Sequence, residues 1–95
     1  MELEKFYEDD QVVYQYLLTP EEVRDFTGNP CYDGWAILEV YPETQIVNSF
    51  YFDGPERPSI REIAKIRQWN EEDFDKVAMW LHGREPDNVN SSSGR

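Results

Sequence analysis

Two stretches rich in apolar, β-branched and aromatic residues, 35–41 and 46–52, constrain the fold of this chain most strongly, because they read as two strands. They are separated by residues 42–45 (Pro-Glu-Thr-Gln), a connection of the length that joins the strands of a β-hairpin. The residues that share one face of the first strand are all apolar: Ala36, Leu38 and Val40. The sequence therefore predicts a hairpin that packs against the hydrophobic core through this face.

A strand and a short helix are predicted before the hairpin. Residues 11–18 are rich in β-branched and aromatic side chains, which is typical of a strand. Thr19 and Glu22 have the spacing of a capping box, and Pro20 suits the first turn of a helix. Gly28 is placed to end that helix. Its predicted inward-facing residues are Val23 and Phe26.

Two further helices are predicted after the hairpin. Ser59 and Glu62 repeat the capping-box spacing, which predicts a helix that continues to about Trp69. Asn70 with Asp73 predicts the start of another helix, and Gly83 its end. The residues that form an apolar stripe on this last helix are Phe74, Val77, Ala78 and Leu81. We expect Leu38, Val40, Phe74, Val77 and Leu81 to be buried.

The fold class that these elements predict is α+β. A small three-stranded, mainly antiparallel sheet is packed on one face by helices, in the order β-α-β-β-α-α. A chain of 95 residues has the size of one domain, which we place at residues 1–87. Residues 88–95 (Asn-Val-Asn-Ser-Ser-Ser-Gly-Arg) cannot bury apolar area, so we expect a disordered tail there.

Charge is divided unevenly along the chain. Residues 1–56 hold thirteen acidic residues against Lys5 and Arg24, so this part carries the whole net charge of −11. Residues 57–95 hold seven acidic and seven basic residues. A strongly acidic surface is repelled by nucleic acid and anionic membranes and is attracted to basic partners.

The residue types that catalysis and metal binding need are scarce. His82, the single histidine, falls in the last turn of the last predicted helix, where a cation interacts favourably with the helix dipole. Cys31, the single cysteine, has no histidine near it in the sequence. Zinc requires several Cys or His ligands, and the carboxylates do not follow the spacing of a calcium-binding loop. The sequence predicts a protein that is not an enzyme and needs no cofactor or metal.

Direct binding to nucleic acid is also disfavoured. A helix-turn-helix reading of the last two helices requires a basic second helix. The acidic residues of that predicted helix are Glu71, Glu72, Asp73 and Asp75, against Lys76 alone. The basic residues of the helix before it can pair with neighbouring carboxylates: Arg61, Lys65 and Arg67.

Acidic and aromatic residues are interleaved in the first third of the chain. The predicted partner-binding residues are Glu8, Asp9, Asp10, Tyr14, Tyr16, Glu21, Glu22, Asp25, Tyr32 and Asp33. Carboxylates on a rigid surface can imitate a phosphate backbone, and aromatic side chains supply the apolar anchors of interfaces.

This pattern predicts a small acidic inhibitor or immunity-type protein, a possible nucleic-acid mimic of the phage or bacterial type. Such a protein blocks a basic partner that acts on nucleic acid. The alternative is a non-catalytic accessory subunit that docks through an apolar patch, in which case the aromatic residues are core and the acidity only keeps the protein in solution.

The sequence also predicts a cytoplasmic location. Residues 1–5 are acidic and precede no apolar segment, so we expect no secretory leader. The chain holds no apolar run near the ~20 residues that span a bilayer. A single thiol suits a reducing compartment.

Overall fold

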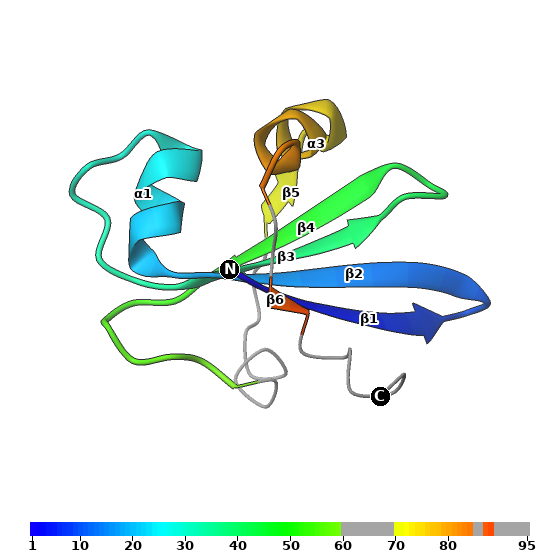
Figure 1. The fold of residues 1–95 in the computed structure, drawn as a ribbon, viewed down its shortest axis with the longest axis horizontal. Coiled ribbons are helices and arrows are strands. Elements are labelled where there is room, and N and C mark those ends of the chain that lie inside the picture. Colours follow the sequence, from blue (N-terminus) through cyan, green and yellow to red (C-terminus); the bar gives the residue numbers. More distant parts are fainter. Residues whose placement is uncertain (60–69, 85–86, 89–95) are drawn as a thin grey trace.

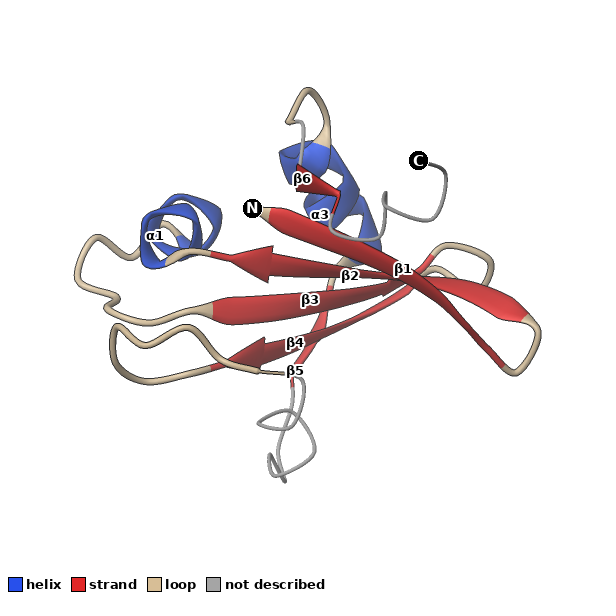
Figure 2. Ribbon diagram, turned by 60° about the horizontal axis from the view of Figure 1, so that its bottom comes forward, coloured by secondary structure: helices blue, strands red, loops and turns tan. Residues whose placement is uncertain are grey.

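The structure is a computed structural model that describes residues 1–59, 70–84 and 87–88. Its elements are β1 (Glu2–Glu8), β2 (Gln11–Leu18), α1 (Pro20–Thr27), β3 (Ala36–Tyr41), β4 (Ile46–Tyr51), β5 (Asn70–Glu72), α3 (Phe74–Leu81) and β6 (Asp87–Asn88). The strands form one sheet in the order β5-β4-β3-β2-β1-β6. Both described helices lie on the same side of this sheet (Figures 1 and 2). The α+β class is confirmed.

The prediction of a three-stranded sheet is wrong. The predicted strands β2, β3 and β4 form the centre of a larger sheet. On either side, β1 and β5 add antiparallel neighbours, and β6 pairs in parallel with β1. The predicted order β-α-β-β-α-α therefore omits three strands, each with its own physical reason.

The first of these, β1, lacks the composition of a strand. Its sequence, Glu-Leu-Glu-Lys-Phe-Tyr-Glu, is rich in Glu and Lys, which are depleted in strands. It nevertheless pairs with β2 along its whole length, from Glu2 opposite Leu17 to Glu8 opposite Gln11. The turn between the strands is Asp9-Asp10, with φ of 50° and 63°, the left-handed conformation that tight hairpins need. Because no glycine marks this turn, the usual hairpin signal is missing.

The strand β5 occupies residues that the sequence assigns to a helix. Asp73, not Asn70, caps α3, and its side chain accepts hydrogen bonds from the backbone N–H groups of Asp75 and Lys76. The residues before this cap pair with the edge of β4 instead. The hydroxyl of Ser49 donates to the backbone oxygen of Asn70 at 3.1 Å, which fastens β5 to β4. Long-range pairing thus overrides a local capping signal.

The last strand lies at the predicted boundary of the tail. Asp87 and Asn88 pair with Glu2 and Leu3, so the first residue of the predicted tail belongs to the sheet edge. Residues 89–95 lie outside the described residues. So does the body of the helix predicted from Ser59, at residues 60–69.

Helix α1 forms where its capping signals predict. Thr19 and Glu22 make both hydrogen bonds of the capping box, Pro20 is the first helical residue, and Gly28 ends the helix with φ of 74°. Val23 and Phe26 are buried, as predicted. The helix therefore covers one end of the sheet and leaves the opposite end, with both hairpin turns, uncovered by it (Figure 1).

The main core lies between the sheet and the two described helices. Its buried residues are Leu18, Val23, Phe26, Ala36, Leu38, Val40, Val47 and Val77. Of the predicted core, Leu38, Val40 and Val77 are buried, whereas Phe74 and Leu81 are half-buried at its border. The other face of the sheet also bears buried apolar residues: Val13, Ile37 and Phe50.

Close contact between two loops explains one glycine. Gly34 bridges to Gly54, and a Cβ atom added at Gly34 would lie 1.8 Å from the backbone oxygen of Phe52. Since that neighbour is backbone, the strain cannot be relieved by a side-chain rotation.

We expect Gly34→Ala to lower the free energy of unfolding by about 3 kcal/mol, the upper end of the usual cost of overpacking. Chemical denaturation measures this loss. Gly28→Ala is the control, because its Cβ would meet nothing within 4 Å and only the left-handed backbone is strained, at about 1–2 kcal/mol. Equal losses for both variants would contradict the proposed contact.

Candidate functional site

The ten residues predicted to bind a partner do not form one surface. Glu8, Asp9 and Asp10 lie at the β1–β2 turn, whereas α1 begins after the other end of β2. The eight residues of β2 separate these groups by roughly 26 Å at the usual rise per residue. Tyr14 and Tyr16 lie between them on the strand. The single acidic face that the sequence suggests is thus divided into two ends.

The acidic residues of α1 make structural contacts. Glu22 belongs to the capping box, and its Oε2 lies 3.0 Å from the amino group of Met1. Asp25 accepts hydrogen bonds from Trp80 Nε1 at 2.9 Å and from Arg84 at 2.6 Å. These bonds join α1 to α3. Glu21, in the first helical turn, and Asp25 are both exposed, whereas Glu22 is half-buried.

Tyr32 and Asp33 belong to the loop that packs against the end of β4. The Tyr32 hydroxyl donates to the backbone oxygen of Phe52 at 3.1 Å, and its ring makes an edge contact with Tyr51. Burial raises the pKa of Tyr32. Asp33 is exposed, and its backbone oxygen accepts from Gly54. Tyr32 is therefore a packing residue, whereas Asp33 is an exposed carboxylate at this end.

The two hairpin turns lie at the same end of the sheet, opposite α1 (Figures 1 and 2). Antiparallel pairing of β2 with β3 brings the start of β2 beside the end of β3. We call four carboxylates at this end of the sheet the hairpin end: Glu8, the last residue of β1, and Asp9, Asp10 and Glu43 on the turns. All four are exposed. Within the part of the chain that the structure describes, no ion pair involves any of them.

Glu43 was not among the predicted site residues. The sequence places it in a hairpin turn but does not say which other turn lies nearby. A tyrosine links the two hairpins on the face of the sheet that points away from the helices: the Tyr41 hydroxyl donates to Glu8 Oε2 at 3.1 Å. This bond crosses β2 and holds the end of β1 against the end of β3.

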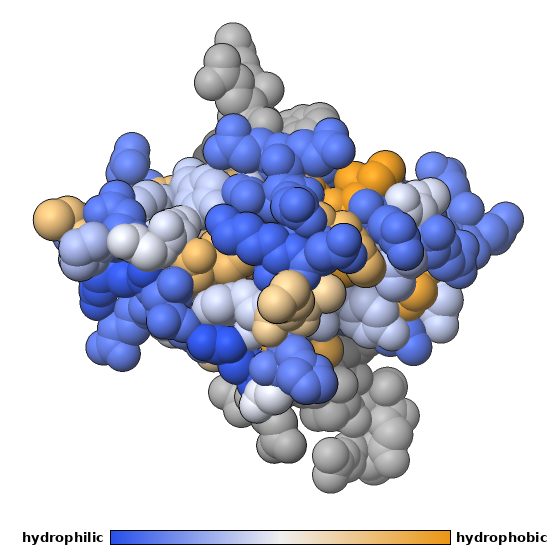
Figure 3. All heavy atoms as spheres, turned by 90° about the horizontal axis from the view of Figure 1, so that it is seen from above, coloured by the Kyte–Doolittle hydropathy of each residue, from blue (hydrophilic) through white to orange (hydrophobic). Residues whose placement is uncertain are grey.

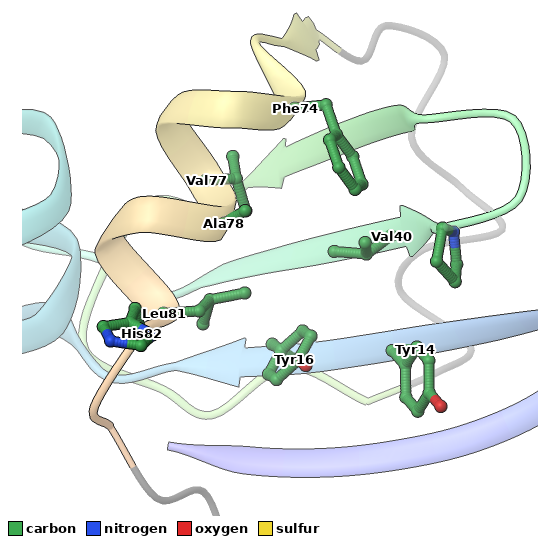
Figure 4. A pocket seen from close by; sticks show the side chains of 9 residues that line it. Tyr14, Tyr16, Val40, Phe74, Val77, Ala78, Leu81 and His82 are labelled. Carbon is green, nitrogen blue, oxygen red and sulfur yellow. The ribbon is translucent and has the colours of Figure 1, made fainter.

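An open pocket lies beside the hairpin end, between α3 and the sheet (Figure 4). Its volume is about 300 Å³, at the small end of ligand pockets. Its lining residues are Tyr14, Tyr16, Val40, Pro42, Phe74, Val77, Ala78, Leu81 and His82. Two predicted site residues, Tyr14 and Tyr16, thus come together here.

The pocket is uncharged over most of its wall. Val40 lies directly across from Tyr14 in the sheet, and α3 supplies the opposite side with the apolar stripe predicted from its spacing. Burial raises the pKa of Tyr16, with a smaller contribution from Tyr14, so the Tyr16 hydroxyl stays neutral at physiological pH. Figure 3 views the molecule from the side on which the helices lie. Its surface there is mostly hydrophilic, with small hydrophobic patches between the polar side chains.

A row of polar residues crosses the opposite face of the sheet. Glu39 lies between Gln15 and Asn48, its partners on β2 and β4. Gln15 is buried, and Asn48 Oδ1 is buried without a hydrogen bond from any described residue. Burial raises the pKa of Glu39, opposed by hydrogen bonds from Asn48, Gln15 and Tyr41 and reinforced by the charge of Glu8.

The position of Glu39 has a consequence for stability. A raised pKa means that folding favours the protonated carboxyl, so its stabilising contribution is complete below the ordinary value of 4.5 and is lost as pH rises through the folded value. Glu39→Gln replaces the carboxylate with a neutral amide whose N–H can donate toward Asn48.

We therefore expect Glu39→Gln to raise the melting temperature at pH 7 and to have less effect near pH 4, where the wild-type carboxyl gains its proton. Thermal melts over pH 4–7 measure the difference. Glu43→Gln, on an exposed turn, should show no such trend. A stability gain that does not grow with pH would refute the role of burial.

The residues considered for catalysis do not come together as a site. Cys31 is exposed in its loop and does not line the pocket, whereas His82 does. His82 forms the C-terminal cap of α3 through its backbone N–H. In residues 1–59, 70–84 and 87–88, no three His, Cys, Asp or Glu side chains are placed to share a metal ion.

No helix in the described ranges is long and apolar enough to cross a membrane.

No family model matches the chain, and no curated protein or solved structure is significantly similar to it. The geometry and charge of the hairpin end and the pocket therefore carry the functional inference.

Proposed function

We propose that this protein is a non-catalytic binding domain that blocks a basic partner protein through its hairpin end. The partner is a protein that itself acts on nucleic acid, whose binding groove the carboxylates occupy in place of phosphates. This makes the chain an acidic inhibitor of the immunity or nucleic-acid-mimic type.

One observation carries the proposal. Two separate hairpins place four exposed carboxylates at the same end of a rigid sheet, and none of them has an ion pair within the described part of the chain. Other acidic residues are engaged with cations, as Glu2 is with Arg57 at 2.5 and 2.6 Å. Unneutralised carboxylates on a firm support attract basic surfaces and speed association.

The backbone supports this use of the turns. The Asp9-Asp10 turn is closed by the seven residue pairs of β1 and β2, and the Tyr41–Glu8 hydrogen bond ties this hairpin to the next. Carboxylates held in fixed positions lose little conformational freedom on binding. A rigid acidic end can therefore bind more tightly than the same charges on a loose segment.

A second candidate function is that of an accessory subunit that docks through its apolar surface. The pocket beside α3 favours it, because an open apolar pocket is typical of a protein interface. In that case the acidity only maintains solubility, and binding is insensitive to salt. The response to salt separates the two functions.

The proposal predicts that reversing charge at the hairpin end slows association. The variant Asp9→Lys/Asp10→Lys/Glu43→Lys should associate with the captured partner at least about tenfold more slowly at low salt. Exposed charges contribute little stability, but Lys at the left-handed Asp9 and Asp10 strains the turn, so thermal melts establish that the variant is folded. Wild-type association should also slow as salt shortens the screening length to ~8 Å at physiological ionic strength. Affinity capture followed by binding kinetics at two salt concentrations measures both effects.

The matched control reverses three exposed carboxylates at the other end of the sheet: Asp33, Asp53 and Glu56. It changes the net charge by the same amount, so it should slow association far less. Equal slowing by both variants would mean that the net charge, and not the position of the carboxylates, sets the association rate. Salt-insensitive binding by wild type and both variants would favour the accessory subunit.

We further propose a cytoplasmic location. The single Cys31, exposed and without a disulfide partner in the chain, is consistent with a reducing compartment.

A further inference from the structure

The pocket beside the hairpin end differs from the acidic turns in chemistry, and the two adjoin. Pro42 lines the pocket and is followed directly by Glu43 of the hairpin end. Asp10 directly precedes β2, and Tyr14 lies four residues further along the chain, about 13 Å at the usual rise of a strand. A single bound segment can therefore reach both features.

We propose that the pocket receives one large apolar side chain of a basic segment, whose flanking Lys and Arg side chains contact the hairpin end. This inference rests on the proposed function and specifies the partner's chemistry. The occupant is an extended or helical peptide of the partner, with an aromatic or branched aliphatic residue between basic ones.

The walls of the pocket fit such a side chain. Tyr14 and Tyr16 form one side from β2, and α3 forms the other with Phe74, Val77 and Leu81 (Figure 4). Val77 is fully buried at the base, whereas the two tyrosines, Phe74 and Leu81 are half-buried and keep part of their surface for a ligand. The pocket volume of about 300 Å³ is at the lower end of the range for small-molecule sites. It suits the single anchoring side chain of a protein interface.

Charge selects the kind of segment that brings this side chain. The neighbouring turns carry Asp9, Asp10 and Glu43. Lys5 lies across from Tyr14 on the pocket's face of the sheet, and its Nζ is 5.7 Å from the centroid of the Tyr7 ring. Basic flanks are therefore attracted and acidic flanks repelled. The same argument disfavours a second copy of this chain, which would bring another net charge of −11 to the interface.

Ala78 offers a way to close the pocket without entering the core. It lines the pocket but is exposed, so Ala78→Phe fills the space from the helix side. Met79, the next residue, is 77% exposed and does not line the pocket, which makes Met79→Phe the matched control. Tyr14→Ala is a second test variant, because it removes one aromatic wall and leaves the buried residues in place.

The test uses three synthetic peptides: Gly-Arg-Lys-Trp-Lys-Arg-Gly, the same peptide with Ala in place of Trp, and Gly-Glu-Glu-Trp-Glu-Glu-Gly. Affinity is measured by NMR titration of the labelled protein at low salt. We expect the basic Trp peptide to bind at least tenfold more tightly than the basic Ala peptide, with shifts at the pocket residues of β2 and α3. Ala78→Phe and Tyr14→Ala should reduce this preference to less than threefold, and Met79→Phe should preserve it. Thermal melts establish that each variant is folded.

Failure of the inference and failure of the proposed function are distinguishable. Equal binding of the two basic peptides, with loss of both in the hairpin-end variant, would overturn the pocket inference and leave the acidic function standing. Equal binding of the acidic and basic Trp peptides would overturn the basic occupant and the proposed function together. Concentration-dependent dimerisation with shifts at the pocket would assign the surface to a second copy and overturn the inference.

Discussion

Pairing of β2 with β3 joins two hairpins into one sheet, and the rest of the molecule depends on it. The register sets Tyr14 opposite Val40 and Leu18 opposite Ala36, so apolar side chains of both strands face the same helices. The antiparallel direction also brings the β1–β2 turn and the β3–β4 turn to one end. The core, the pocket and the hairpin end are three consequences of a single strand pairing.

The pairing of β2 with β3 gives the two faces of the sheet different chemistry. On the helix side, Trp80 holds α1 and α3 together. Its ring makes an edge contact with the Phe26 ring, with centroids 5.2 Å apart, and its N–H donates a hydrogen bond to Asp25. On the other face, the same register aligns Gln15, Glu39 and Asn48 in a polar row. Burial of a carboxyl in this row costs stability at neutral pH, which a neutral amide avoids.

Exposed carboxylates acquire meaning only from where the fold puts them. Glu22 caps α1 and pairs with the amino group of Met1. Asp25 accepts hydrogen bonds from Trp80 and Arg84. Asp9, Asp10 and Glu43 stay unneutralised among the described residues and adjoin an uncharged pocket. A basic segment with one apolar side chain complements both features, which is why the proposed partner is a basic protein and the proposed contact is not charge alone.

The sequence by itself determined the elements whose signals are local. The capping box of α1, the strand-like composition of β3 and β4 and the apolar stripe of α3 all involve residues within one or two turns or one strand. It also determined the acidity of residues 1–56, because charge is a property of composition. Only the tertiary structure decided that Glu-rich residues 2–8 form a strand. It also decided that residues 70–72 pair with the edge of β4 instead of starting a helix, and that Glu43 lies at the same end as Asp9 and Asp10. These depend on hydrogen bonds and contacts between residues distant along the chain, whose favourable energy outweighs weak local preferences that point elsewhere.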